Sequence, residues 1–184
     1  MSSVVVVGSE WPFATVPAVP TGALYSILLV LHVLCAVVGF GTLVATGVQA
    51  ARARRGPGAG GAEGVRRYFR PGVNWAGRAL YGVPVFGVAL LGASAGAFEA
   101  GDGFVVVGMA LWLLAAVMAE AVVWPDERRV QAALPGLWAR HPGADGAGAD
   151  GAGAFDRTCR RLALSAVVLA FVFVAAVVVM VGKP

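Results

Sequence analysis

The chain has 184 residues, of which 59% are hydrophobic and only 13% are charged, and its mean hydropathy is +0.80. Soluble domains carry about a quarter charged residues, so this composition excludes an ordinary soluble domain and indicates a membrane protein. The net charge of +4 comes from basic residues grouped between hydrophobic segments, a pattern of membrane topology, and we expect no nucleic acid partner.

Residues 1–23 precede the first long hydrophobic stretch. They contain no Lys or Arg to form a charged leader, and their only apolar run is four valines. We therefore do not interpret them as a cleavable signal peptide. We expect an extracytoplasmic N-terminal segment.

Four later stretches approach or exceed the roughly 20 apolar residues that a helix needs to cross about 30 Å of hydrocarbon. They cover about residues 24–48, 79–98, 104–124 and 162–182. Runs of this length satisfy their backbone hydrogen bonds in lipid as helices. The sequence therefore predicts an all-α fold, a four-helix transmembrane bundle in one membrane domain over residues 24–184.

Thirteen of the 14 Lys and Arg residues fall in the connecting segments 49–78 and 125–161, whereas the turn between the second and third stretches has none. By the positive-inside rule both segments are cytoplasmic loops, and both termini are extracytoplasmic. We expect a multi-pass protein of a bacterial cytoplasmic (inner) membrane. Residues 143–154, rich in Gly, Ala and Asp, read as a low-complexity linker.

Polar and small residues of the first span recur every three or four positions, at His32, Cys35, Gly39, Thr42 and Thr46. This spacing places them on one helix face. One interpretation is a packing stripe, in which small residues allow close approach and polar ones bond to a neighbouring helix. The other interpretation is a ligand site.

The ligand interpretation rests on His32 and Cys35, which lie one helical turn apart. Met109 of the third span lies at a comparable but shallower depth, and a His, Cys and Met set suits Cu(I). Alternatively, His32 is an axial ligand of haem b. The other histidine, His141, lies in the second basic loop, so the second axial ligand would be Met or come from a second subunit.

Glu120 is the only carboxylate within a predicted span. Buried carboxylates need a partner, so we expect an ion pair with Arg78, assisted by Asn74; the alternative is a proton- or cation-binding site. Motifs of the common hydrolases, metalloproteases, kinases and dinucleotide-binding enzymes are absent, which disfavours an enzyme without excluding one.

Helix shape and packing depend on a few further residues. Pro84 should bend the second span and free a carbonyl near Leu80. Gly92 and Gly96 form a GxxxG step that predicts close helix packing, as does Gly39 in the first span.

Three segments, LHVLCAVVGFG, RRYFRPGVNWAGRALYGVPVFG and AEAVVWPDERRVQ, resemble an uncharacterised bacterial family of integral membrane proteins related to the copper resistance protein D superfamily. The resemblance covers about residues 24–130. It implies a four-helix membrane unit with a histidine early in its first helix, here His32, linked in relatives with copper handling or, in a protoporphyrinogen oxidase branch, with haem. The additional membrane histidines and methionine-rich tracts of a copper importer are missing.

Three functional hypotheses follow, and the resemblance favours the first. The first is binding or transport of a copper-like metal ion or a proton, through His32 in the outer half and Glu120 in the inner half. The second is a haem b protein, oligomeric if a second subunit supplies a ligand. The third is a structural or accessory membrane subunit without its own ligand, in which His32 and Glu120 are internal packing polar groups; the expected partners are the lipid bilayer and further copies or a larger membrane complex.

Overall fold

The computed structural model describes residues 22–56, 61–139 and 149–182, and every regular element within them is helical. In chain order these are α1 (Ala23–Ala53), α2 (Ala62–Tyr68), α3 (Trp75–Arg78), the 3₁₀ helix η1 (Ala79–Tyr81), α4 (Gly82–Ala93), α5 (Gly103–Met118), the π-helix η2 (Ala119–Val123), α6 (Trp124–Ala139) and α7 (Ala149–Val181).

Four helical stretches in the described part of the chain are long and apolar enough to cross a membrane. They are α1, the run from α3 through α4 (Trp75–Ala93), the run from α5 through α6 (Gly103–Trp138) and Gly151–Val181 of α7. The chain is therefore a multi-pass membrane protein, and the predicted all-α four-helix transmembrane bundle is confirmed.

The helices extend well beyond the predicted spans and include the last residues of the predicted low-complexity linker 143–154. Residues 149–154 form the first turns of α7, and α6 continues to Ala139 through the predicted loop 125–161. Helix α6 continues because it has an apolar face: Val130 and Leu134 lie one helical turn apart, and both are buried in the core. Residues 143–148 and most of the predicted N-terminal segment lie outside the described residues.

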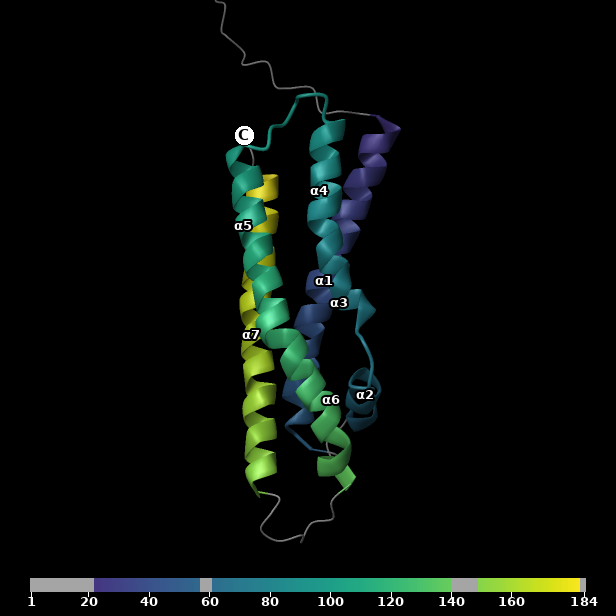
Figure 1. Ribbon diagram of the computed structural model, residues 1–184, viewed down its shortest axis with the longest axis vertical. Coiled ribbons are helices and arrows are strands. Elements are labelled where there is room, and N and C mark those ends of the chain that lie inside the picture. The colour runs from purple at the N-terminus through teal and green to yellow at the C-terminus, as the bar shows by residue number, and fades with distance from the viewer. Residues whose placement is uncertain (1–21, 57–60, 140–148, 183–184) are drawn as a thin grey trace, which may run out of the picture.

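The bundle divides into two halves along its long axis (Figure 1). The arginine-rich half contains α2, α6, the end of α1 and the start of α7; the opposite half contains α4, α5, the start of α1 and the end of α7. With 33 residues, α7 is about 50 Å long, about 20 Å more than the hydrocarbon thickness. This helix is therefore longer than a membrane crossing requires.

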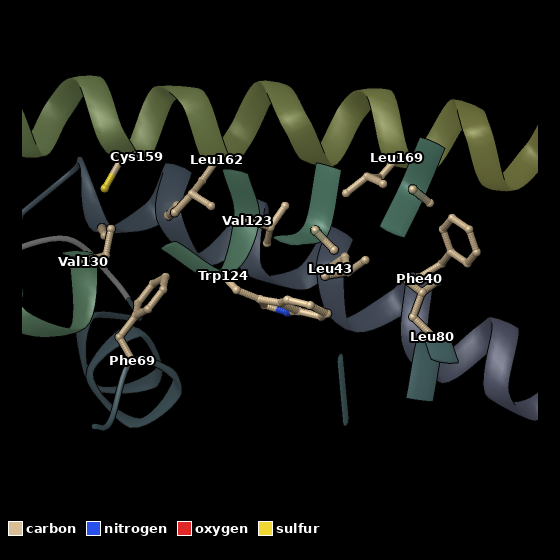
Figure 2. Packing of buried hydrophobic residues seen from close by; sticks show 14 of the residues in the cluster. Phe40, Leu43, Phe69, Leu80, Val123, Trp124, Val130, Cys159, Leu162 and Leu169 are labelled. Atoms are coloured by element: carbon tan, nitrogen blue, oxygen red, sulfur yellow. The ribbon is translucent and has the colours of Figure 1, made fainter. Parts of the chain in front are cut away.

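The hydrophobic core is concentrated towards the arginine-rich half. Figure 2 shows Leu162 and Leu169 of α7 pointing towards Leu43 of α1 and Val123 of η2. Helices α1 and α7 make the most extensive contact, and they cross at Gly47, where an added Cβ would collide with Ala166 and the Leu162 carbonyl. This crossing holds the bundle together.

The opposite half is more open. There α4 packs on α1 and α5 packs on α7, but α4 and α5 touch each other at few points. The two helix pairs separate towards the α4–α5 connection (Figure 1). The separation leaves room for a cavity between them.

The long third span changes register at the π-helix η2, which carries Glu120. Pro125 lies two residues after the end of η2, and because it has no N–H it cannot donate the backbone bond that an α-helix would require of it. Single-turn π segments are frequent at functional sites. The π-helix therefore makes the region around Glu120 a candidate functional region.

Candidate functional site: an apolar cavity beside His32

A cavity of about 430 Å³ lies between α1, α4, α5 and α7 in the opposite half of the bundle. Most of its lining is apolar, with a set of aromatic side chains from α1, α5, α7 and the α4–α5 turn: Tyr25, Phe40, Phe98, Phe104, Trp112 and Phe173. This volume is in the range of cofactor and small-molecule sites. Among the lining residues, His32 is the only one with a strong metal-ligating side chain.

His32 is held in place by the backbone of α4. Its Nδ1 lies 2.9 Å from the Val83 carbonyl oxygen, and its ring packs against Gly87, where a Cβ would be 3.4 Å from Cε1. A carbonyl oxygen can only accept, so Nδ1 carries the proton. In the neutral ring, Nε2 then keeps a free lone pair, as metal-ligating histidines do.

Two of the three predicted ligands line the cavity, and the third, Cys35, lies outside its lining. Met109 lines the same cavity as His32, whereas Cys35 does not. The Cys35 thiol packs instead on Gly82, where an added Cβ would lie 2.5 Å from Sγ. In the described residues no three His, Cys, Asp or Glu side chains group as metal ligands. Of the three predicted copper ligands, His32 and Met109 share the cavity.

The carbonyl freed by Pro84 is that of Leu80, as predicted. Pro84 has no N–H to offer to Leu80, four residues earlier. The indole Nε1–H of Trp112 donates to the Leu80 oxygen instead, at 2.9 Å. This bond joins α5 to the base of α4 below the cavity, and the sequence did not indicate Trp112 as the donor.

Glu120 contacts Arg78, as the sequence predicted, but its nearer partner is Tyr81. The Arg78 Nη1 lies 3.5 Å from the Glu120 Oε1, and the Tyr81 hydroxyl donates to the same oxygen. The Arg78 guanidinium also stacks on the Trp124 ring, 3.6 Å from its centroid. Arg78 is thus held between a carboxylate and an indole.

Asn74 does not assist this pair, which corrects the prediction. Its Nδ2 donates to Glu127 Oε1 at 3.3 Å and to the Tyr68 hydroxyl at 3.4 Å. The Tyr68 hydroxyl is also 2.6 Å from Thr46 Oγ1 on α1. Burial raises the pKa of the Tyr68 phenol, which therefore stays protonated. The Asn74 side chain bonds to Glu127 because the Glu127 carboxylate is nearly fully buried and needs a hydrogen-bond donor.

No family model, no curated protein and no solved structure matches the chain. The contacts of the site itself therefore carry the functional assignment.

The sequence interpretation missed two buried acids, because it placed them in a loop. Glu127 is one, and Asp126, with 1% of its side chain exposed, is the other. Arg129 Nη1 donates to Asp126 Oδ1 at 2.7 Å, and Arg161 Nε lies 3.0 Å from Oδ2 without aiming its N–H at it. The spacing of Val123, Val130 and Leu134 would have indicated the helix that buries them.

The predicted packing glycines behave differently from one another. An added Cβ on Gly39 would lie 2.6 Å from the backbone nitrogen of Leu80, so α1 and η1 approach closely there. Gly92 faces open space, and Gly96 lies beyond the end of α4 with φ of +84°. The GxxxG prediction fails within this chain because α4 ends before its second glycine, which serves a left-handed turn.

Proposed function

We propose that this protein binds haem b in the cavity of the opposite half, with Nε2 of His32 as an axial ligand. The observation that carries the proposal is the 2.9 Å bond from His32 Nδ1 to the Val83 carbonyl. It orients the ring and leaves the lone pair of the other nitrogen available, in a site lined by apolar and aromatic side chains.

The shape and chemistry of the cavity support a large, flat and mostly apolar ligand. Three helices and the α4–α5 turn contribute aromatic rings to its walls, and its volume of about 430 Å³ far exceeds what a bare metal ion needs. The resemblance to the copper resistance protein D superfamily, which has a haem-linked branch, agrees with this ligand. A second axial ligand would come from Met109 or from His32 of a second copy in a homo-oligomer.

Copper is the second candidate, because Met109 and His32 share the cavity. Two soft or borderline ligands would suit Cu(I), but the third predicted ligand, Cys35, packs on Gly82 instead. A proton path from His32 to Glu120 has less support, since the buried side chains of Phe40 and Leu80 occupy the intervening level. Haem b therefore ranks above copper and proton transfer.

The placement in the membrane follows from charge. The arginine-rich half faces the cytoplasm of a bacterial cell, both termini are extracytoplasmic, and the cavity lies in the outer half of the inner membrane. The arginine-rich half carries 11 arginines among the described residues: Arg52, Arg54, Arg55, Arg66, Arg67, Arg70, Arg128, Arg129, Arg157, Arg160 and Arg161.

A haemin titration of the purified protein in detergent tests the proposal. We expect a Soret band shifted from that of free haemin, and His32→Ala should weaken binding tenfold or more, about 1.4 kcal/mol, because the axial bond is lost. Cys35→Ser is the matched control, because it lies one turn away and outside the cavity.

Three results would contradict haem b. One is an unshifted Soret band in the wild type, and another is equal affinity in His32→Ala and the wild type. The third is stoichiometric Cu(I) binding to the wild type that both His32→Ala and Met109→Leu abolish, while the wild type does not bind haemin. That last result would establish the copper alternative.

A further inference from the structure

A polar cluster lies on the outer surface of the bundle where the second and third spans meet. It consists of Glu120, Arg78 and Tyr81, and 55% of the Glu120 side chain and 28% of the Arg78 side chain are exposed. Glu120 lies 17 residues after Gly103, about 26 Å along the helix, near the far boundary of about 30 Å of hydrocarbon. The cluster therefore faces the headgroup region of the leaflet at the arginine-rich half.

Both charges of the cluster retain unused bonding capacity. Within the described residues the contacts of Glu120 all involve Oε1, so Oε2 has no hydrogen-bond donor. The Arg78 guanidinium has five N–H groups, more than its contacts with Glu120 and the Tyr81 hydroxyl can use, while the Trp124 ring covers one of its faces. The Oε2 atom of Glu120 can thus accept a hydrogen bond next to the Arg78 guanidinium, which can donate further ones.

Two exposed apolar stripes run from this cluster into the hydrocarbon region. On α4 the stripe continues from Tyr81 through Val85 and Val88; on the third span it continues from Glu120 through Val117 and Leu113. Both follow helical spacing of three or four residues, so each forms one face. Helices α4 and α5 touch at few points, and the polar cluster with these two stripes is called the seam below.

We infer that this seam binds a phospholipid with a phosphoethanolamine headgroup. The lipid ammonium donates to Glu120 Oε2, the adjacent phosphate accepts from Arg78, and an acyl chain lies along the two apolar stripes. Adjacent opposite charges on the protein match adjacent opposite charges on the headgroup, and both contacts are charge-assisted hydrogen bonds. This inference is independent of what the cavity binds.

The ammonium is what selects this lipid among common bilayer components. A choline headgroup has the same charge but no N–H to donate to Glu120. A glycerol headgroup leaves a net negative charge next to the carboxylate, which is unfavourable at close range. Of these three headgroups, only ethanolamine supplies both a positive charge and N–H donors to Oε2.

Thermal unfolding in lipid nanodiscs tests the inference, with the full chain and dioleoyl lipids throughout. We expect phosphatidylethanolamine to raise Tm by about 2–4 °C over pure phosphatidylcholine in the wild type. Glu120→Gln should lose most of this increment, because the amide keeps the shape but not the charge. Glu63→Gln, on the exposed surface of α2, should keep it.

Comparing the increment between lipids separates headgroup binding from general stability. An increment that survives in Glu120→Gln would overturn the inference and indicate an effect of bilayer properties. So would equal Tm values in the two lipids, or a larger increment with phosphatidylglycerol. If Glu120→Gln does not fold, native mass spectrometry of the wild type decides: retained phosphatidylethanolamine in preference to phosphatidylcholine supports the site, and no preference overturns it.

Discussion

At the scale of single residues, the role of a glycine depends on which part of the chain packs against it. Gly39 lies where the backbone of η1 passes, and the Cβ of any other residue would be 2.6 Å from the Leu80 nitrogen and 2.8 Å from its Cα. Backbone atoms cannot rotate away as a side chain can. Gly92, in contrast, has no heavy atom within 4 Å of an added Cβ.

These two glycines make a matched pair of variants. We expect Gly39→Ala to destabilise the protein by about 1–3 kcal/mol, because the extra methyl overpacks the contact between α1 and η1. Gly92→Ala should be neutral or stabilise by up to about 1 kcal/mol, since alanine is the better helix former. Thermal unfolding in one detergent measures both, and equal destabilisation would contradict the described packing.

At the scale of elements, the second span is tied to its neighbours by side chains bonded to its backbone. The indole of Trp112 donates to the Leu80 oxygen, and His32 donates to the Val83 oxygen. These bonds come from α5 and α1, and they fix the base of α4 on both sides. The cavity wall is therefore positioned by hydrogen bonds as well as by packing.

A double-mutant cycle tests the link between Pro84 and Trp112. Trp112→Phe should cost about 1–2 kcal/mol, in excess of the lost packing, because the Leu80 carbonyl loses its donor. In a Pro84→Ala background the cost should be smaller, since the substituted alanine supplies a backbone N–H to that carbonyl. Strictly additive effects on the free energy of unfolding would show that the two residues do not share this oxygen.

At the scale of the whole molecule, the two halves of the bundle differ in the polarity of their side chains. Ion pairs join the helices of the arginine-rich half, between Arg54 and Asp156 and between Arg161 and Asp126. In the opposite half the exposed side chains of the helices are mainly valine and leucine. One half is suited to water and headgroups, and the other to lipid.

Site-specific labelling tests the orientation in the membrane. Single cysteines replace Gly101 in the α4–α5 turn or Gly64 on α2, both open positions, in a Cys35→Ser, Cys159→Ala background. We expect a membrane-impermeant maleimide to label position 101 in intact cells and position 64 only after lysis. The reverse pattern would place the arginines outside and contradict the proposed topology.

By itself, the sequence determined the membrane class and the helical fold. Hydrophobic length and composition are local properties, and continuous apolar runs near 20 residues can satisfy their backbone only as helices when lipid is the solvent. The freed carbonyl of Leu80 and the pairing of Glu120 with Arg78 were also predictable, because the first follows from helical register and the second from the scarcity of charges in the spans.

Only the tertiary structure decided where the helices end and which side chains share a site. Charged residues interrupt a hydropathy pattern without ending a helix, so α6 and the start of α7 looked like loop. Cys35 lies one turn from His32 in the sequence, yet it packs on Gly82 and leaves the cavity to His32 and Met109. The residues that contact His32 and Cys35 belong to other helices. Which side chains meet depends on how each helix is rotated against the next, and contacts between residues far apart in the chain set that rotation.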